Sequence, residues 1–555
     1  MKKFLAMLMA LMMLCASASA LELSEVGVLP LTTEDVTLTI GLCENMLTTD
    51  YENNYVTQLI EERTGVKLDF VKFPSDTAEA KQKFSLMVAG NQELPDILVL
   101  GLNDAERFQY GRDGYFLPLN DYIEKYAHYW NISMDTWASQ KEKEDVIKYA
   151  ASPDGNIYAY PNYYIDPADA VSLYMSINKV WLDKLGLEVP TTTDELYTVL
   201  KAFKENDANG NGDPNDEIPM MGANSGWASV NAFIMNAFLY DAFNAQGKYL
   251  LTAEDGKLSA PFVEDAYREG LRYLHKLYEE GLISPLSYSQ TDAEAKAIMQ
   301  APADQDSLVG VVVGHPSPWF GTDVPRTLDY VGIPSLTGPE GVNYAIFNFQ
   351  SGTYNTFITA DCEYPELAYR VIDACAETTT SMSIRFGIQD VNWRFVDGGP
   401  SRYSGISDEY VAVYEQNFTP GVDAPWTTEN NTIWHANIFN MLPPKLMGGN
   451  LLVPYASQYQ EYKLGELCYN TFPKRYNLHP EEMPYKLVFT EDELDQISDI
   501  EASLRTYVDE ANVLFTLGQL DIENDWESYL NELKAIGLDY YLEVAQGAYD
   551  RINGK

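Results

Sequence analysis

Apolar positions recur with two different periods in the first hundred residues, and the periods alternate along the chain. Val36–Leu42, Val66–Val71 and Asp96–Leu100 are short β-rich or alternating runs typical of strands. Between them, Tyr55–Thr64 and Thr77–Ala89 repeat apolar residues at helical spacing. Strands that alternate with helices in this way predict a parallel sheet and an α/β fold.

The same two patterns continue over the rest of the chain. Two capping boxes, Thr192 with Glu195 and Thr490 with Glu493, each predict the start of a helix. The second of these helices carries one long apolar stripe. The further strands are expected at Leu173–Asn178, Val309–Val313, Tyr344–Phe349 and Thr356–Thr359, and the further helices at Trp181–Leu185, Tyr267–Glu280, Pro365–Thr378 and Trp526–Ile552.

The first twenty residues predict an export signal. A start with two lysines precedes the apolar run Phe4–Leu14, which is shorter than the roughly twenty residues that a membrane span needs. Ala18-Ser19-Ala20 is a small-x-small cleavage site, so we expect the mature, exported chain to begin at Leu21. Lipid attachment at Cys15 is the alternative.

Composition narrows the classes of function. The formal net charge of -45 repels nucleic acid and anionic membrane surfaces, so neither is expected as a partner. The sequence holds no P-loop, no HExxH zinc motif and no GxSxG elbow. Cys43, Cys362, Cys375 and Cys468 are too widely spaced for a zinc site and are expected as buried thiols, with a Cys362–Cys375 bridge left open.

The segment Asp207–Glu217 has the residue types of a cation-binding loop. Oxygen-bearing side chains stand at every second position through Asp213, with small residues between them. Ca²⁺ takes six to eight oxygen ligands, and one such loop can supply them. The segment is not an EF-hand, because Ile218 stands at the twelfth position, where an EF-hand needs a glutamate. An Asn/Gly turn without metal is the alternative.

Several stretches, taken in order, make the chain resemble the extracellular solute-binding proteins of ABC importers, in particular their carbohydrate-binding branch. The resemblance covers nearly the whole mature chain. Its motifs are Glu61-Glu-Arg-Thr-Gly-Val66, Leu94-Pro-Asp-Ile97, Gly114-Tyr-Phe-Leu-Pro-Leu-Asn-Asp121, the segments 177–192 and 269–282, Gly387-Ile-Gln-Asp-Val-Asn-Trp393 and Gln546-Gly-Ala-Tyr-Asp-Arg551. In the Gly387 segment, Asp390 stands where the family has its second glycine.

The resemblance implies a two-lobed periplasmic-binding-protein-like α/β fold of type II, with the ligand in a cleft between lobes joined by crossing strands. We expect residues 21–167 plus 350–405 in lobe 1. Lobe 2 is expected to hold residues 168–349 plus 406–555, with the loop and the C-terminal helices.

Family members that bind acidic oligosaccharides carry a similar loop that holds calcium, so the resemblance implies a structural Ca²⁺ here. Carried over to this sequence, the ligands are Asp207, Asn209, Asn211, the backbone carbonyl of Asp213, Asp216 and Glu217. One extra residue separates Asp216 from Asp207 compared with the family pattern, which leaves Asn215 as an alternative to Asp216.

Aromatic side chains can cover the apolar faces of a sugar, and Asp or Asn can satisfy its hydroxyls. The carboxyl ends of the first strands point to the Gly101–Asp104 loop. For each aromatic candidate, a buried structural role is the alternative. The expected ligand-binding residues are Asn103, Asp104, Tyr163, Tyr164, Trp227, Trp319, Asp390, Trp393 and Trp426.

We therefore expect a monomeric binding protein, and no enzyme, that delivers a carbohydrate, in particular an oligosaccharide, to membrane permease subunits served by a separate ATPase. A binder of peptide or another small solute on the same fold is one alternative. A secreted polysaccharide-degrading enzyme is the other, although with 82 acidic residues some carboxylate pair always exists and supports no such role.

Overall fold

The structure is a computed structural model. It describes residues 21–167, 175–224, 226–241, 250–300, 306–314, 319–320, 325–347, 352–404, 407–416, 425, 429–435, 439, 441–452, 478–484 and 487–553. The predicted signal segment, with its cleavage site and Cys15, lies outside these residues, as do Trp426 and Cys468. Within the described residues, no helix is both long enough and apolar enough to cross a membrane.

The chain divides into two compact units, each built from several separate segments. Unit 1 comprises residues up to 164 with 352–393 and 422–443, and unit 2 comprises 165–351, 394–421 and 444–555. Both units mix helices with a sheet, so the predicted α/β fold class is confirmed.

The sheet of unit 1 has the strand order β11-β3-β1-β2. The strands are β1 (Thr37–Cys43), β2 (Lys67–Phe73), β3 (Ile97–Val99) and β11 (Thr356–Ile358). As the sequence predicted, β1 pairs in parallel with both β2 and β3, whereas β11 returns from late in the chain and pairs antiparallel with β3.

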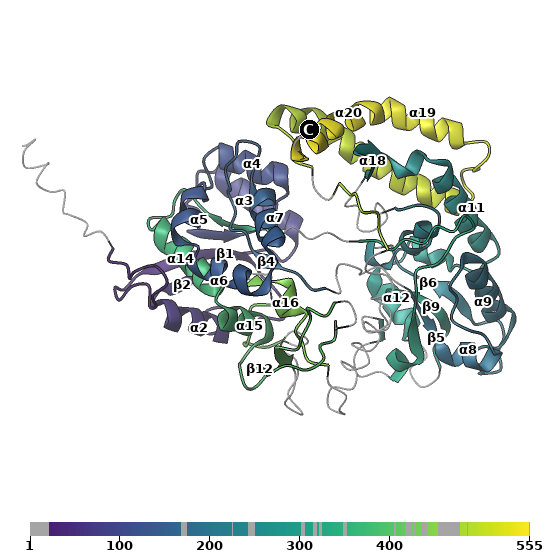
Figure 1. Cartoon of the computed structure of the whole chain (residues 1–555), viewed down its shortest axis with the longest axis horizontal. Coiled ribbons are helices and arrows are strands. Elements are labelled where there is room, and N and C mark those ends of the chain that lie inside the picture. The colour runs from purple at the N-terminus through teal and green to yellow at the C-terminus, as the bar shows by residue number, and fades with distance from the viewer. Residues whose placement is uncertain are drawn as a thin grey trace, which may run out of the picture. The chain divides into compact units, whose positions relative to one another are not determined.

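The helices of unit 1 (Figure 1) are α2 (Tyr55–Thr64), α3 (Thr77–Ala89), α4 (Asp104–Arg112), α5 (Asn120–Tyr126), α6 (His128–Trp137), α7 (Gln140–Ala150), α14 (Pro365–Cys375) and α15 (Thr378–Phe386). Helix α14 is central, because it contacts α2, α5, α6 and α15. Helix α2 spans the predicted range, and Gly65 ends it at φ 75°, a left-handed conformation that glycine adopts without strain.

An N-terminal arm, residues 21–34, belongs to unit 1 and is tied to it by hydrogen bonds. The amide of Leu31 donates to the Thr64 carbonyl (2.8 Å). The Arg370 guanidinium, only 4% exposed, donates to the carbonyls of Ser24 (2.7 Å) and Glu25 (2.9 Å). A buried arginine that binds main-chain carbonyls fixes the path of the arm.

Residues 422–443 lie in unit 1, whereas the sequence placed 406–555 together in lobe 2. Backbone pairing explains the difference. The short strand β14 (Met441–Leu442) pairs in parallel with β4 (Tyr163–Tyr164), and Asn430 bridges to Thr48. The buried Trp434 ring also packs edge-on against Phe70 of β2 (5.6 Å between centroids).

The sheet of unit 2 has the order β10-β5-β9-β6. Its strands are β5 (Met175–Asn178), β6 (Ile218–Met221), β9 (Val309–Val313) and β10 (Tyr330–Ile333). Strand β9 is fully buried and pairs in parallel with β6 and antiparallel with β5. The carboxyl ends of β6 and β9 therefore lie at the same edge of the sheet.

The helices of unit 2 include α8 (Lys179–Leu185), α9 (Thr193–Glu205), α10 (Val230–Ile234), α11 (Asp265–Glu279), α12 (Asp292–Met299), α16 (Pro444–Met447), α18 (Glu491–Thr516), α19 (Trp526–Ile536) and α20 (Leu538–Ile552); β7 (Thr252–Glu254) and β8 (Lys257–Ser259) form a hairpin. Both predicted capping boxes are present, at the starts of α9 and α18. The expected helix over 526–552 is two helices, because the chain turns at Gly537 with φ 121°.

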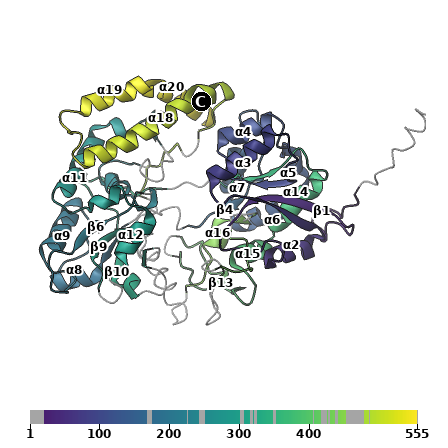
Figure 2. The ribbon, with the colours of Figure 1, turned by 180° about the vertical axis from the view of Figure 1, so that it is seen from behind.

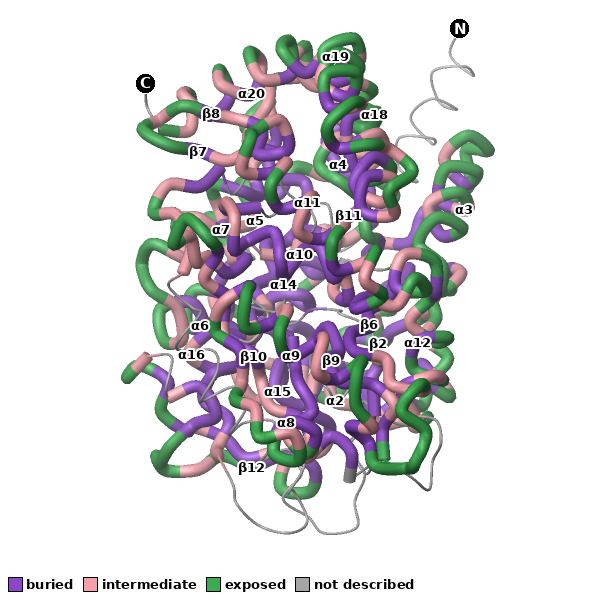
Figure 3. The backbone as a smooth tube through the Cα atoms, turned by 90° about the vertical axis from the view of Figure 1, so that its right-hand side faces the viewer, coloured by how far each residue is buried: buried purple, intermediate pink, exposed green. Residues whose placement is uncertain are grey.

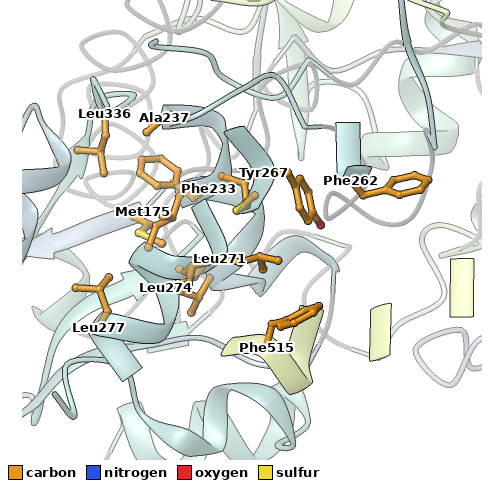
Figure 4. Close-up of a cluster of buried hydrophobic side chains, with 14 of the residues drawn as sticks. Met175, Phe233, Ala237, Phe262, Tyr267, Leu271, Leu274, Leu277, Leu336 and Phe515 are labelled. Carbon is orange, nitrogen blue, oxygen red and sulfur yellow. The ribbon is translucent and has the colours of Figure 1, made fainter. Parts of the chain in front are cut away.

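One large apolar cluster fills unit 2. It joins α11 to α18, the first of the C-terminal helices drawn in yellow in Figures 1 and 2. Figure 4 shows Leu271, Leu274 and Leu277 of α11 in the cluster with Phe515 of α18. In Figure 3, buried and exposed residues alternate along α18 and α19, as expected of amphipathic helices that bury one face.

Candidate functional site

Two tryptophans stack at the carboxyl edge of the unit 2 sheet. Trp227 follows β6, Trp319 follows β9, and their ring centroids lie 4.5 Å apart at an angle of 21°. Trp319 is 1% exposed, and its indole Nε1 donates to the Val313 carbonyl (2.7 Å). Trp227 is half-buried. The buried Trp319 ring therefore supports the Trp227 ring, and Trp227 is the one of the two that has accessible surface.

Neighbouring groups hold Trp227 in place. Its Nε1 donates to Asp292 Oδ2 (2.8 Å) at the start of α12. Gly314 has φ 88°, and a Cβ there would lie 2.7 Å from the Trp227 ring. Only glycine fits this close approach. A fixed indole ring loses little conformational entropy when a ligand stacks on it.

In unit 1, Asn103 and Asp104 lie beyond the carboxyl end of β3, where the sequence placed them, and both are exposed. Each also has a structural partner. Asn103 accepts from the Glu106 amide (2.8 Å) in the capping box that starts α4, and Asp104 pairs with Arg107 (3.0 Å). Their role in ligand binding stays a prediction.

Tyr163 and Tyr164 lie side by side on β4 but differ in exposure. Tyr163 is 3% exposed and donates to Glu142 (3.3 Å), and burial followed by that carboxylate raises the pKa of its hydroxyl. Tyr164 is half-buried, and the Arg385 guanidinium lies 5.8 Å from its ring centroid. Of the two, Tyr164 has the side chain that a ligand can reach.

The Gly387–Trp393 segment forms a tight turn in unit 1. Trp393 is fully buried and donates from Nε1 to the Gly387 carbonyl (2.9 Å), so in this structure it shapes the turn and has no exposed ring face. Asp390 is exposed with φ 61°, a left-handed position that suits the glycine of the family pattern.

The Asp207–Glu217 loop is compact and held together by its own side chains. Asp207 accepts from the amides of Gly210 (2.7 Å) and Gly212 (3.1 Å), which have φ of 83° and 94°. The Asp216 carboxylate accepts from the side-chain amides of Asn209 (3.0 Å) and Asn211 (2.6 Å). The side chains of three predicted ligands, Asn209, Asn211 and Asp216, therefore meet.

Glu217 is the member of the loop with an unsatisfied atom. Its Oε1 accepts from the Asn209 amide (3.4 Å), while Oε2 is buried without a hydrogen-bond partner, and burial raises the pKa of this carboxyl. An orphaned carboxylate oxygen beside Asp216 fits a hard cation, which prefers oxygen ligands. Asp213 and Asn215 are exposed and bond to each other (3.1 Å).

Among the described residues, no group of three or more His, Cys, Asp or Glu is placed to hold a metal ion. A cation in the loop would therefore depend on Asn and main-chain oxygens as well as on carboxylates. Cys43, Cys362 and Cys375 are free thiols, so the Cys362–Cys375 bridge left open by the sequence is absent.

Two further polar residues of unit 1, Arg385 beside Tyr164 and its neighbour His435, lie outside the predicted ligand-binding set. Arg385 lies close to His435, whose pKa is lowered by burial and then by the arginine charge. His435 Nε2 is 3.2 Å from the side-chain nitrogen of Asn430. No local motif marks these residues, because His435 and Arg385 are fifty positions apart in the sequence.

Comparisons with known proteins agree on one family. The model of bacterial extracellular solute-binding proteins matches residues 47–379. The curated fructooligosaccharide ABC transporter substrate-binding protein FusA of Streptococcus pneumoniae is 26% identical over 530 residues, covering 90% of this chain and 88% of FusA.

Solved structures show the same fold. FusA in complex with kestose has a TM-score of 0.69 at 24% identity and covers 93% of this chain and 99% of its own. A human-milk-oligosaccharide (HMO) binding solute-binding protein from Bifidobacterium longum infantis has a TM-score of 0.70 at 20% identity, with 93% and 99% covered. Alginate-binding protein AlgQ2 without calcium ion reaches 0.64 at 21%, with 94% and 99% covered.

Proposed function

Because the chain belongs to the bacterial extracellular solute-binding proteins, we propose that it captures an oligosaccharide outside the cell and delivers it to an ABC importer. The observation that carries the sugar class is the Trp227–Trp319 stack at the carboxyl edge of β6 and β9. A half-buried indole ring that is supported by a second, buried indole suits the apolar face of a sugar ring.

The relatives support the same ligand class. FusA is a fructooligosaccharide-binding protein that aligns over most of both chains, and the related structures include proteins that bind kestose, milk oligosaccharides and alginate. The family consists of binding proteins, so chemistry on the sugar is not part of the function. Transport would require membrane permease subunits and a separate ATPase, because the sequence has no P-loop.

Calcium binding by the Asp207–Glu217 loop is a second part of the proposal. Asp207, Asn209, Asn211, Asp216, Glu217 and the Asp213 carbonyl would hold the ion, and its charge would compensate the crowded carboxylates. The solved relatives include a FusA EF-hand mutant and AlgQ2 without its calcium, which supports a metal loop in related proteins. The role would be structural, since all ligands come from one loop.

Export is expected of an extracellular family. Cleavage behind Ala20 and a monomeric state remain our proposals, as does lipid attachment at Cys15 as the alternative to cleavage.

Calorimetric titration of the mature protein against fructooligosaccharides, other neutral oligosaccharides, oligogalacturonates and peptides tests the function. We expect binding to a neutral oligosaccharide, weakened about tenfold or more by Trp227→Ala. Trp137→Ala is the matched control, because Trp137 is equally half-buried but lies in α6, outside the predicted site. Binding of peptides alone, or equal affinity in both variants, would overturn the proposal.

A further inference from the structure

Unit 1 contains a cavity of about 450 Å³ that none of the predicted ligand-binding residues lines. Its walls come from three segments: the beginning of the N-terminal arm, helix α5 and the start of α14. The lining residues are Leu21, Leu23, Asp121, Tyr122, Lys125, Tyr126, Tyr364, Pro365, Glu366 and Leu367. All of them belong to unit 1, so the cavity is complete within one compact unit.

The aromatic walls are fixed before any ligand arrives. Tyr122 and Tyr126 stand one turn apart on α5, with ring centroids 6.1 Å apart. Tyr122 also stacks on the buried Tyr369 (5.9 Å, 29°), and the Tyr126 hydroxyl donates to Glu366 (2.9 Å). Preorganised rings cost little entropy on binding.

The arm side of the cavity is fixed as well. Arg370 lies one turn beyond Glu366 on α14, pairs with it (3.3 Å), and bonds the carbonyls of Ser24 and Glu25. These contacts hold Leu21 and Leu23 against the cavity. The hollow is therefore part of the fold of unit 1, with an apolar wall from the arm and charged side chains on both the α5 wall and the α14 wall.

The polar groups favour hydroxyl donors over ions. Asp121 pairs with Lys125 (3.2 Å), and Glu366 is shared by Tyr126 and Arg370, so each carboxylate is partly neutralised and keeps acceptor capacity. A carboxylate or phosphate ligand would meet both acids and a net charge of -45. An organic cation would meet Lys125 and the α-ammonium group that the proposed cleavage behind Ala20 leaves on Leu21. A neutral ring with an apolar face and hydroxyl rim fits the three tyrosines and the two acceptors.

We propose that this cavity is a second carbohydrate site, which takes one neutral sugar ring and is independent of the Trp227 site. The volume lies within the range of small-ligand pockets, and the partly open wall suits the end of a chain. Two independent sites on one protein would lengthen its residence on a polymeric glycan.

Ligand-observed saturation-transfer NMR of the mature protein with glucose, galactose, mannose and fructose tests the proposal. We expect weak, millimolar binding of at least one of these sugars. Tyr364→Ala should weaken it about tenfold by removing one ring wall, and Leu23→Trp should abolish it by filling the cavity. Tyr540→Ala, which changes an exposed tyrosine in unit 2, is the matched control.

The two sites are separable in this experiment. Trp227→Ala should leave the monosaccharide signal unchanged, and Leu23→Trp should leave oligosaccharide titration at the Trp227 site unchanged. No signal with any monosaccharide, a signal that survives Leu23→Trp, or binding of tetramethylammonium in place of sugar would overturn the second site without affecting the proposed function.

Discussion

Helices α14 and α18 are each central to one unit, and they are held by different chemistry. Helix α18 is buried through Ile497, Leu504, Val508 and Phe515, all 0% exposed in one apolar cluster. Helix α14 instead places charged side chains inside unit 1, with Arg370 at 4% and Asp373 at 2% exposure. Stability around α18 therefore follows apolar burial, while stability around α14 depends also on the ionisation of buried groups.

The buried carboxylate of α14 is supported on several sides. Asp373 accepts from the amides of Tyr129 (2.9 Å) and Trp130 (3.0 Å) at the start of α6, and from the Tyr160 hydroxyl (3.3 Å). Burial nevertheless raises the pKa of Asp373 to about 6. The desolvation of the charge outweighs these three hydrogen bonds.

The largest expected effect comes from an apolar truncation at α18. Phe515 packs against Trp526 and Tyr529, so Phe515→Ala should destabilise unit 2 by about 3–5 kcal/mol. The loss should be the same at pH 5 and pH 7, because neither of these two contacts titrates in that range: Trp526 is not ionisable, and burial raises the pKa of Tyr529. Denaturant unfolding at both pH values measures it, with the exposed Val180→Ala as control; a strong pH dependence would contradict the contrast between the helices.

The second prediction concerns the pH dependence of α14. The folded-state pKa of Asp373 is raised, so its contribution to stability is present at low pH and is lost as pH rises from about 4 to about 6. The free energy of unfolding should fall by up to about 3 kcal/mol across this range. Asp373→Asn should remove this slope, so the stability of the native chain relative to the variant should fall across that window. Parallel curves for the two proteins would show that Asp373 does not titrate as described.

The third prediction concerns calcium, which should affect stability through the Asp207–Glu217 loop of unit 2. Calcium at a hundredfold excess over its Kd should stabilise the native chain by about 2.7 kcal/mol, and Asp207→Ala should lose this gain. Asp50→Ala, which changes a partly exposed aspartate that caps a turn in unit 1, is the control. Differential scanning calorimetry with calcium or with a chelator measures both. A calcium response that persists in Asp207→Ala would place the ion elsewhere.

The smallest expected effect tests the support of Trp227. Thr291 caps α12, the helix whose Asp292 binds the Trp227 indole, and Thr291→Ala should cost about 1 kcal/mol. Hydrogen exchange should rise in α12 and around Trp227 and stay unchanged in α14. Thr198→Ala on the exposed face of α9 is the control. Equal hydrogen exchange in the two variants would show that the cap of α12 does not help to hold Trp227.

Most of the sheet of unit 1 could be predicted from local pattern, because β1, β2 and β3 are consecutive in the chain and joined by helices. The helices α4, α7 and α12 were not predicted, although each begins with a capping box: Asn103 with Glu106, Ser139 with Glu142, and Thr291 with Glu294. Each of these motifs could have been used to predict the start of a helix. The same motif explains why Asn103, expected as a ligand residue, also has a purely structural partner.

The rest could not be predicted locally. The segment 422–443 joins unit 1 through contacts with residues hundreds of positions earlier, which no periodicity reveals. Strand β11 also pairs with residues far earlier, and only the family resemblance placed it in lobe 1. Burial could not be inferred either: Trp227, Trp319 and Trp393 all stand in loops in the sequence, yet only Trp227 keeps accessible surface. The loop at 207–217 could be recognised from the sequence because all its residues are consecutive.

The late return of β11 has a consequence for how the chain is made. The chain leaves unit 1 after Tyr164 and comes back at Gly352, where β11 and α14 follow. A nascent polypeptide that has emerged only as far as unit 2 therefore lacks one edge strand of its first sheet and the helix that buries Arg370. Because such long-range pairing forms slowly, we expect the first sheet to be completed only after the chain of unit 2 has been made.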